Sequence, residues 1–378
     1  MRKLIVVFGM MVTAVMMTAG MARAQAGNTC VYANDDVYFG NGPNTVDGYL
    51  VTATSQTYVA PLSTTGEGDG NSQMRNIVMH PTNSILYASD SHSGDIAAMK
   101  INPSTCQLTL LGVYPLPGGA SQGIGLAITP DGKHMYAAGV SSAELNGLDV
   151  LADGSLTSVR QKVALANKPS AMAVSPDGST LIIGLPETRG GREEELVSYS
   201  INSSTGVVTP VSIVNAYGFP GSIAINAQST FAYVEEPDID ALRVSLFGIG
   251  KGGTVTFVKA YDFSEITGDY LSADALLSVT GKYLYVTNPQ LASISTLQVN
   301  SVTGALKYVT TSEDGTLGSD APLGLATSKN GEFIFTGDDL FGDYLGILAA
   351  GQDGSLTSLG TFPMDSAGLT RWIAAKSF

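Results

Sequence analysis

Positive charge is scarce in this sequence. Its 378 residues include 19 lysines and arginines against 33 aspartates and glutamates, so the net charge is −14 and only 14% of residues are charged, compared with about 25% in typical domains. Nucleic-acid binding and docking on anionic lipid both need basic surface, so the charge balance argues against both. Disorder is disfavoured too, because 44% hydrophobic residues are enough to fill a core. Low charge together with 44 glycines fits an all-β secreted protein.

The residues that usually bind metals or perform catalysis are also few, with three histidines and two cysteines. No Gly-x-Ser-x-Gly elbow, phosphate-binding P-loop or dinucleotide fingerprint occurs, and no His/Cys cluster is suitable for zinc. Hard cations prefer clustered oxygens, which makes Asp35-Asp36 and Asp338-Asp339 the candidates for calcium or magnesium. Neither pair lies in a spaced calcium-loop signature. We therefore expect no metal and no cofactor, with Ca²⁺ or Mg²⁺ as the alternative.

Long apolar runs are confined to the N-terminus. A basic start at residues 1–3 precedes an apolar stretch over residues 4–21, followed by Ala22-Arg23-Ala24. These features predict a secretory signal peptide over residues 1–24; the alternative is a membrane anchor, for which this run is barely long enough. Its removal takes away Arg2, Lys3 and Arg23 and leaves a net charge of 16 − 33 = −17. We expect a secreted or periplasmic protein without a membrane span after cleavage.

One short phrase recurs along the chain. In its clearest copy, residues 169–184, a small-residue strand is followed by a turn at Ser175-Pro176-Asp177-Gly178 and a second apolar strand. Proline presets φ, aspartate bonds back to the backbone, and glycine takes positive φ. Equivalent turn positions fall at residues 83, 132, 178, 229, 281 and 331, with separations of 49, 46, 51, 52 and 50. A period of about 40–50 residues with several strands per unit is typical of a β-propeller.

Each repeat contains four expected strands. Six complete units begin near residues 74, 122, 169, 220, 272 and 322. Strands at residues 30–33, 48–52 and 57–62 lack a first strand, and residues 371–377 read as a first strand with nothing after it. Joining these two ends makes one more blade and removes exposed sheet edges. We predict one all-β domain over residues 25–378, a seven-bladed β-propeller of four-stranded blades whose last blade combines N-terminal and C-terminal strands.

The expected first strands share a column of small residues. Innermost strands crowd around the axis of a propeller, so small side chains are favoured there. The column reads Val78, Ala127, Ala173, Ala224, Leu276, Ala326 and Ala375.

The two cysteines fall in neighbouring predicted blades, on the face that carries the Pro-Asp-Gly turns. Cys30 begins the second strand of the closing blade, and Cys106 lies in a third-to-fourth turn of the next one. In an oxidising compartment an isolated pair favours a disulfide. A bridge would close a loop of about 76 residues and stabilise the fold by several kcal/mol. The alternative is two unrelated buried thiols.

The repeated Ser-Pro-Asp-Gly phrase, the Thr-Gly hairpins and the split blade resemble the lactonase-like seven-bladed propellers. That class includes bacterial 6-phosphogluconolactonases, fungal carboxymuconate-lactonising enzymes and surface-layer proteins with Tyr-Val-Thr-Asn repeats, a phrase that occurs here at Tyr285-Val286-Thr287-Asn288. The resemblance covers the chain from about Cys30 onward and implies the fold and lactone hydrolysis. The chain departs from the class at one point. Phosphogluconolactonase-type members place histidine after the proline that leads a first strand, and no Pro-His occurs here.

The face expected to bind ligands is formed by second-to-third loops and by loops that enter first strands. Near the channel mouth, Arg75, Asp274 and Arg371 each begin a first strand. Arg75 and Arg371, from adjacent blades, are predicted to hold a carboxylate or phosphate; the alternative is that each arginine pairs with a neighbouring aspartate. We take Arg75, Arg371, Asp274, Asp90 and Asp338 as ligand-binding candidates. The acids expected on this face are Asp35, Asp36, Asp90, Glu144, Glu187, Glu235, Glu236, Asp238, Asp269, Asp274, Asp320, Asp338 and Asp339.

Few side chains in the sequence could act as a general acid or base in catalysis. His80 falls in a turn slot and is interpreted as structural, and His134 lies in a second strand. His92 lies in a second-to-third loop on the expected ligand face. The catalytic candidates are therefore Asp274, Glu144 and His92.

Three functional hypotheses follow. The absence of the histidine motif favours a secreted, monomeric, non-catalytic propeller that binds a small anionic ligand or a protein on its acidic loop face. The first alternative is a lactone hydrolase of the 6-phosphogluconolactonase type. The second is a structural protein of the cell envelope, as the Tyr-Val-Thr-Asn phrase suggests.

Overall fold

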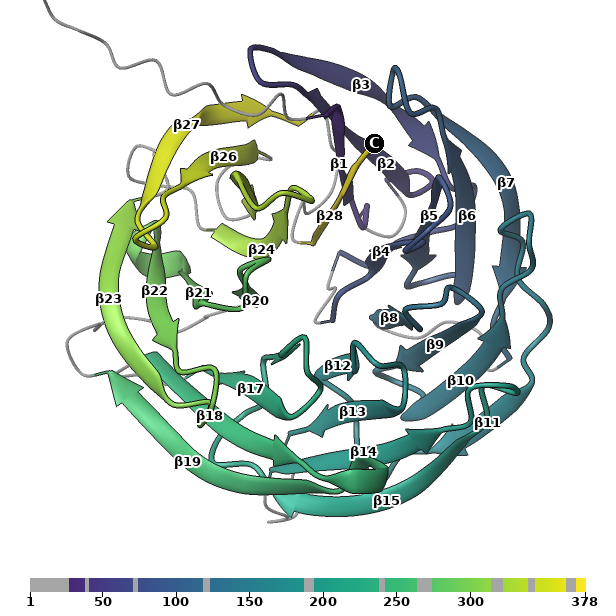
Figure 1. Cartoon of the computed structure of the whole chain (residues 1–378). Coiled ribbons are helices and arrows are strands. Elements are labelled where there is room, and N and C mark those ends of the chain that lie inside the picture. Colours follow the sequence, from purple (N-terminus) through teal and green to yellow (C-terminus); the bar gives the residue numbers. More distant parts are fainter. Residues whose placement is uncertain are drawn as a thin grey trace, which may run out of the picture.

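The computed structural model describes residues 27–37, 41–70, 74–117, 123–186, 194–237, 242–263, 274–313, 322–338, 344–364 and 372–378. Within these residues, seven four-stranded antiparallel sheets stand around a central axis as the blades of a ring (Figure 1). This arrangement confirms the predicted seven-bladed β-propeller. The predicted signal peptide, residues 1–24, lies outside the described residues.

Blade 1 contains strands from both ends of the chain. From the axis outward it consists of β28 (Ile373–Ser377), β1 (Thr29–Asn34), β2 (Thr45–Val51) and β3 (Gln56–Ser63). β28 runs antiparallel to β1, with Val31 opposite Ala375 and Ala33 opposite Ile373. The ring is therefore closed as predicted, because the C-terminal strand supplies the innermost position that the N-terminal strands lack.

The other six blades follow in chain order, each built from the axis outward. Blade 2 has β4 (Ile77–Met79), β5 (Ile85–Asp90), β6 (Asp95–Ile101) and β7 (Leu108–Pro115), and blade 3 has β8 (Ile124–Ile128), β9 (His134–Gly139), β10 (Glu144–Asp149) and β11 (Gln161–Ala164). Blade 4 has β12 (Ala171–Val174), β13 (Thr180–Leu185), β14 (Glu195–Ile201) and β15 (Val208–Asn215). Blade 5 has β16 (Ser222–Ile225), β17 (Phe231–Glu236), β18 (Leu242–Ile249) and β19 (Val255–Phe263).

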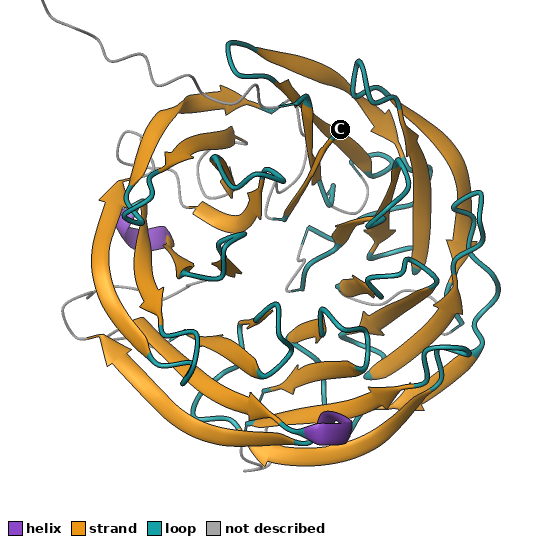
Figure 2. Ribbon diagram, viewed as in Figure 1, coloured by secondary structure: helices purple, strands orange, loops and turns teal. Residues whose placement is uncertain are grey.

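Blade 6 has β20 (Ala275–Leu277), β21 (Tyr283–Asn288), β22 (Ser293–Val299) and β23 (Leu306–Glu313), and blade 7 has β24 (Pro322–Thr327), β25 (Phe333–Asp338), β26 (Tyr344–Ala350) and β27 (Leu356–Pro363). Helix in the described residues is limited to two short 3-10 segments, η1 (Lys251–Gly253) and η2 (Pro289–Leu291) (Figure 2). None of the described helices is long and apolar enough to span a bilayer.

One predicted strand is shorter than expected. The sequence predicts a first strand that starts at Arg75, but β4 begins at Ile77. The backbone carbonyl of Arg75 accepts a hydrogen bond of 2.8 Å from Leu126 N in blade 3. Arg75 is therefore tied to the following blade instead of extending the sheet of its own blade.

The apolar core lies between neighbouring blades. A cluster between blades 1 and 2 includes Cys30, Tyr32, Ile77 and Leu86, all essentially buried. Similar clusters fill the other interfaces, because the two faces of each sheet pack against the sheets on either side.

A repeated tyrosine links successive blades. The hydroxyl of Tyr87 donates to the carbonyl of Gly154 at 2.9 Å, and that of Tyr136 donates to Gly206 at 2.8 Å. The accepting residues sit in third-to-fourth hairpins with positive φ, where glycine costs least. Burial raises the pKa of both phenols, so they stay protonated and act as donors.

The predicted disulfide is confirmed. Cys30 and Cys106 are bridged, with their Cα atoms 5.4 Å apart, and the hydroxyl of Tyr32 donates to the carbonyl of Cys106. Cys106 has φ of +58° at the hairpin position held by glycine in blades 3 and 4. The bridge joins blade 1, which contains both chain ends, to blade 2.

Candidate functional site

The first strands enclose an axial channel. Its cavity has a volume of about 520 Å³ and receives residues from all seven first strands. The small-residue column predicted from sequence lines this channel, so small side chains at these positions keep the axis open. The column consists of Val78, Ala127, Ala173, Ala224, Leu276, Ala326 and Ala375.

Arg75 lies at one end of the channel and contacts three other blades. Its Nη2 donates to Asp274 Oδ2 of blade 6 at 2.5 Å, and its Nη1 donates to the carbonyl of Ile373 in blade 1 at 3.3 Å. Both terminal nitrogens also lie within 3.5 Å of the carbonyl of Leu325 in blade 7. The guanidinium is 5.4 Å from the ring centroid of Trp372, a cation–π distance. Arg75 is thus held across this end of the channel, while its side chain keeps 32% of its exposure.

Asp274 is the buried counterpart of Arg75. Its Oδ2 accepts a hydrogen bond from Leu325 N at 2.8 Å, and its Oδ1 accepts one from Ala275 N at 3.0 Å. Burial raises the pKa of Asp274 above its usual range, and the positive charge of Arg75 together with these donors offsets part of the rise. For Arg75, the pairing with an aspartate is therefore the arrangement observed, but the aspartate belongs to blade 6 and not to an adjacent blade. Arg371 lies outside the described residues.

Asp90 is placed between blades 1 and 2 and is not among the residues that line the channel. Its Oδ1 accepts hydrogen bonds from Asn44 Nδ2 at 2.7 Å and Thr64 Oγ1 at 2.6 Å. Asp95 lies directly opposite Asp90 in the β5–β6 hairpin, and burial, followed by the neighbouring Asp95 carboxyl, raises the pKa of Asp90 well above its usual range.

The acidic loop face differs from the sequence-based expectation. Except for Glu144, its described acids are buried instead of facing solvent: Asp35, Asp36, Asp90, Glu235, Glu236, Asp274 and Asp338. Many of them terminate second strands, where neighbouring blades cover the side chains. Glu236, for example, accepts hydrogen bonds from Ser245 Oγ at 2.8 Å and Tyr217 N at 3.1 Å. Outside the described residues lie Glu187, Asp238, Asp269, Asp320 and Asp339.

One of the two pairs of metal candidates, Asp35 and Asp36, accepts hydrogen bonds from protein donors. Asp35 accepts a hydrogen bond from Thr45 Oγ1, and Asp36 accepts one from Ser91 Oγ, each at 2.5 Å. Within the part of the chain that the structure describes, no group of three or more histidine, cysteine, aspartate or glutamate side chains is arranged to hold a metal ion.

The other two catalytic candidates lie apart from Arg75 and Asp274. His92 is about one-third exposed in the β5–β6 turn, 4.0 Å from the carboxylate of Glu67. Glu144 begins β10 and pairs with Lys162 at 2.9 Å. Neither residue is among those that line the axial channel. The structure therefore brings Arg75 and Asp274 together and leaves Asp90, Glu144 and His92 elsewhere.

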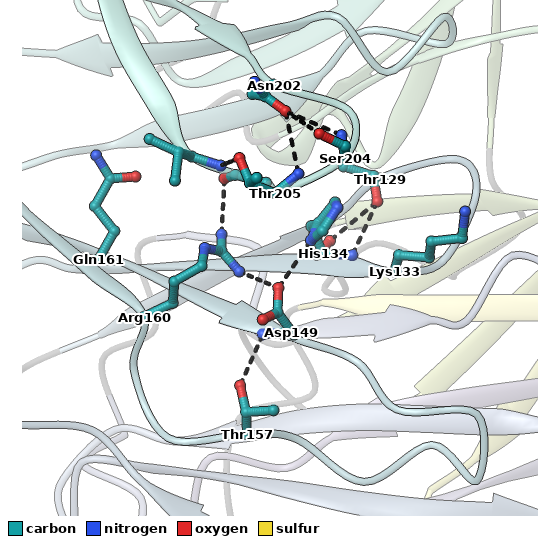
Figure 3. Close-up of polar contacts among 12 residues, drawn as sticks. Thr129, Lys133, His134, Asp149, Thr157, Arg160, Gln161, Asn202, Ser204 and Thr205 are labelled. Carbon is teal, nitrogen blue, oxygen red and sulfur yellow. Dashed lines mark hydrogen bonds and ion pairs between the residues drawn. The ribbon is translucent and has the colours of Figure 1, made fainter.

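A second polar cluster, which sequence reasoning missed, joins blades 3 and 4 (Figure 3). His134 Nδ1 lies 2.9 Å from Asp149 Oδ1, and its Nε2 lies 3.3 Å from the carbonyl of Ser203. Arg160 donates to the same Asp149 oxygen and, at 2.7 Å, to the carbonyl of Gly206. His134 is only 7% exposed, and every partner outside blade 3 is a backbone carbonyl of blade 4. This geometry is that of a structural clasp between blades.

His80 is structural as well. Its Nδ1 accepts a hydrogen bond from Asn83 N at 2.9 Å within its own turn, and its Nε2 lies 3.1 Å from the carbonyl of Gly132 in blade 3. The interpretation of His80 as a turn residue agrees with these contacts.

The fold and the axial site define a class of protein. Seven four-stranded blades, closed by strands from both chain ends around a channel with Arg75 and Asp274 at one end, make this protein a seven-bladed β-propeller. Residues 37–169 match the family model described as "Lactonase, 7-bladed beta-propeller". A 6-phosphogluconolactonase from Serratia proteamaculans (strain 568) is 23% identical over 314 residues, which cover 80% of this chain and 89% of that protein.

Solved structures share the architecture. A putative 6-phosphogluconolactonase from Bacteroides uniformis superposes with a TM-score of 0.71 at 15% identity, covering 92% of this chain and 99% of that one. The periplasmic gluconolactonase of Pseudomonas aeruginosa gives a TM-score of 0.71 at 16% identity, with coverage of 92% and 99%. At these identities the similarity establishes the common fold.

Proposed function

We propose that this protein binds a small ligand carrying a carboxylate or a lactone carbonyl in its axial channel, with Arg75 as the anchor. The observation that carries the proposal is the position of Arg75, the one charged residue among those that line the channel in the described part of the chain. Ligand pockets are typically concave and mostly apolar, with a few polar groups that fix orientation. A guanidinium fixed by four contacts is preorganised to donate hydrogen bonds to a ligand oxygen.

Ligand titration tests this proposal. Trp372 is the only tryptophan in the chain and stacks beside Arg75, so its fluorescence should change when a ligand reaches the channel. We expect carboxylates or lactones to perturb it saturably, and Arg75→Ala to weaken binding at least tenfold. Lys162→Ala, which alters a surface ion pair at Glu144, is the control. Binding that is unchanged in Arg75→Ala would refute the assignment.

Lactone hydrolysis is the second candidate function, and similarity to 6-phosphogluconolactonase favours it. Water would add to the lactone carbonyl polarised by Arg75 and give up one proton to Asp274. The ring C–O bond would then break, and the departing ring oxygen would take up that proton. The raised pKa of Asp274 fits a group that accepts and returns a proton.

A panel of lactones, assayed by proton release with and without EDTA, separates the two candidates. Hydrolysis requires turnover that Asp274→Asn abolishes, because the amide cannot accept the proton. Absence of turnover on every lactone, with saturable binding retained, leaves a binding protein. Loss of lactone turnover on addition of EDTA would show that the reaction requires a metal ion, which neither candidate function includes.

The proposal places the protein outside the cytoplasm. The apolar N-terminal segment ending in Ala-x-Ala supports export, and the Cys30–Cys106 bridge fits an oxidising compartment. Cell fractionation, with N-terminal sequencing of the mature chain, tests both the location and the predicted cleavage after residue 24. A cytoplasmic, uncleaved protein would contradict it.

A further inference from the structure

A second cavity, of about 550 Å³, lies at the end of the axial channel opposite Arg75, on the face that carries the Pro-Asp-Gly turns. β28 runs from one end to the other: the carbonyl of Ile373 accepts a hydrogen bond from Arg75, and Ser377 lines this cavity. Thr327 and Ala375 line both the channel and the cavity. The cavity lies where the closing blade meets blades 2 and 7.

Two lysines line this cavity, Lys376 of β28 and Lys329 of the turn that follows β24. Their segments are joined, because Lys329 N donates to Ser377 Oγ at 3.0 Å. The Nζ of Lys376 donates to the carbonyls of His80 at 2.5 Å and Asn83 at 2.8 Å in blade 2. An ammonium has three N–H donors, and these bonds use two of them. The half-buried Lys376 is thus held in place, while Lys329 is exposed.

The positive charges of these two lysines are not balanced by acidic side chains. Among the residues that the structure describes, neither forms an ion pair with an aspartate or glutamate, whereas Lys133 on the same face pairs with Asp131 at 3.5 Å. Burial lowers the pKa of Lys376, and the positive charge of Lys329 lowers it further. In a chain with 33 acidic residues against 19 lysines and arginines, two neighbouring cations without an acidic partner indicate a counterion from outside the chain.

We propose that this cavity binds a small dianion, with Lys376 and Lys329 as its counterions. Two ammonium groups balance two negative charges, and charge-assisted hydrogen bonds are the stronger kind. The hydroxyl of Ser84, which also lines the cavity, is a further donor. Sulfate, phosphate and short dicarboxylates share this chemistry. Because the cavity lies at the other end of the channel, the inference does not depend on the function proposed for Arg75.

Anion titrations test the charge requirement. Sulfate, inorganic phosphate, malonate and acetate are titrated into the protein by calorimetry at about pH 8, with sodium chloride holding the ionic strength constant. The three dianions should bind saturably and about tenfold more tightly than acetate, because acetate balances only one of the two ammonium groups. Tighter binding of sulfate and phosphate than of malonate assigns the site to tetrahedral oxyanions, and the reverse order assigns it to dicarboxylates.

Lysine variants locate the site. Lys329→Gln should weaken sulfate binding about threefold. Lys329→Glu should abolish it and raise the melting temperature of the anion-free protein, because its carboxylate supplies the missing counterion to Lys376. Lys376→Met should also abolish binding, and the Lys329 variants decide the question if its melting curve shows that it does not fold. Lys133→Gln is the matched control, since Lys133 is 70% exposed on the same face, and it should bind sulfate like the wild type.

Amine labelling gives an independent readout. Acetylation followed by peptide mass spectrometry should show that sulfate slows the modification of Lys376 and Lys329 and leaves that of Lys133 unchanged. The proposal is overturned if no dianion binds saturably, if acetate binds as tightly as sulfate, or if Lys329→Glu binds sulfate like the wild type. An equal loss of binding in Lys133→Gln also overturns it, because binding would then reflect the overall charge of this face.

Discussion

Two blade interfaces contain the same hydrogen bond, from a tyrosine hydroxyl to a hairpin carbonyl of the next blade, but the side chains beside that bond differ. Between blades 1 and 2, Tyr32 donates to the carbonyl of Cys106, and the Cys30–Cys106 bridge lies beside it. Between blades 3 and 4, Tyr136 donates to Gly206, and the His134–Asp149–Arg160 cluster lies beside it. The covalent link ties β1, the strand that pairs with the C-terminal strand β28, to blade 2. The interface between blades 3 and 4 is held beside its tyrosine by hydrogen bonds and an ion pair.

The largest expected loss of stability comes from removing the Cys30–Cys106 disulfide. Cys30→Ala/Cys106→Gly should lower the free energy of unfolding by about 2–5 kcal/mol, because the unfolded chain loses its cross-link. Cys30→Ala/Cys106→Ala should lose about 1 kcal/mol more, since Cys106 has positive φ and alanine is strained there. Urea unfolding measures both. Equal stabilities for the two double variants would show that the left-handed backbone costs nothing at this hairpin.

Disrupting the His134–Asp149–Arg160 cluster between blades 3 and 4 should lower the free energy of unfolding by a smaller amount. Asp149→Ala removes the acceptor of both His134 and Arg160, and we expect about 1–2 kcal/mol, because Asp149 is 38% exposed and partly screened by solvent. Lys162→Ala, in the exposed pair with Glu144, should cost less than about 1 kcal/mol and serves as the control. If the two variants melt at the same temperature, the cluster is not an inter-blade clasp.

The contributions of the two inter-blade hydrogen bonds donated by Tyr87 and Tyr136 can be compared directly. Tyr87→Phe should cost about 1 kcal/mol, since it removes the inter-blade donor to Gly154. Tyr136→Phe should cost less, because Arg160 still donates to the carbonyl of Gly206. Denaturant midpoints of the two variants test the order, and the reverse order would mean that Arg160 does not compensate for the lost hydroxyl.

At neutral pH, the smallest change in stability is expected for Asp90→Asn, in blade 2 next to the closing blade. The folded pKa of Asp90 is raised, so the stability associated with its bound proton is fully present below the usual aspartate pKa of about 3.9. That stability is lost as pH rises through the folded value. Asp90→Asn keeps an acceptor for Asn44 and Thr64 and offers an N–H to Asp95, so its melting temperature should fall less between pH 4 and pH 7. Parallel melting profiles of the wild type and Asp90→Asn would argue against the raised pKa of Asp90.

Repetition made the fold predictable. Six copies of one turn fix the period, and each copy carries its own alternation of strands and turns, so the blade count follows from arithmetic. The closing strand was predictable for the same reason, since residues 371–377 resemble a first strand without successors. The start of β4 was not, because Arg75 is bound by blade 3 through Leu126.

The candidate site was predictable only in part. Arg75 and Asp274 stood out because each precedes a first strand, yet their contact joins residues 199 apart in sequence. Asp90 and Asp338 read as loop acids, and the structure buries them between blades. The role of His134 carried no local signal, since its partners Asp149 and Ser203 come from two separate segments.

The sequence alone determined the repeat, the number of blades and the place of closure, because these depend on local patterns or on simple counting. The tertiary structure decided that Cys30 and Cys106 are bridged, since it brings their Cα atoms to 5.4 Å. The tertiary structure decided which charges meet across the axis and which are buried between sheets. Those outcomes depend on how far each blade is rotated around the ring, and no short stretch of sequence encodes that geometry.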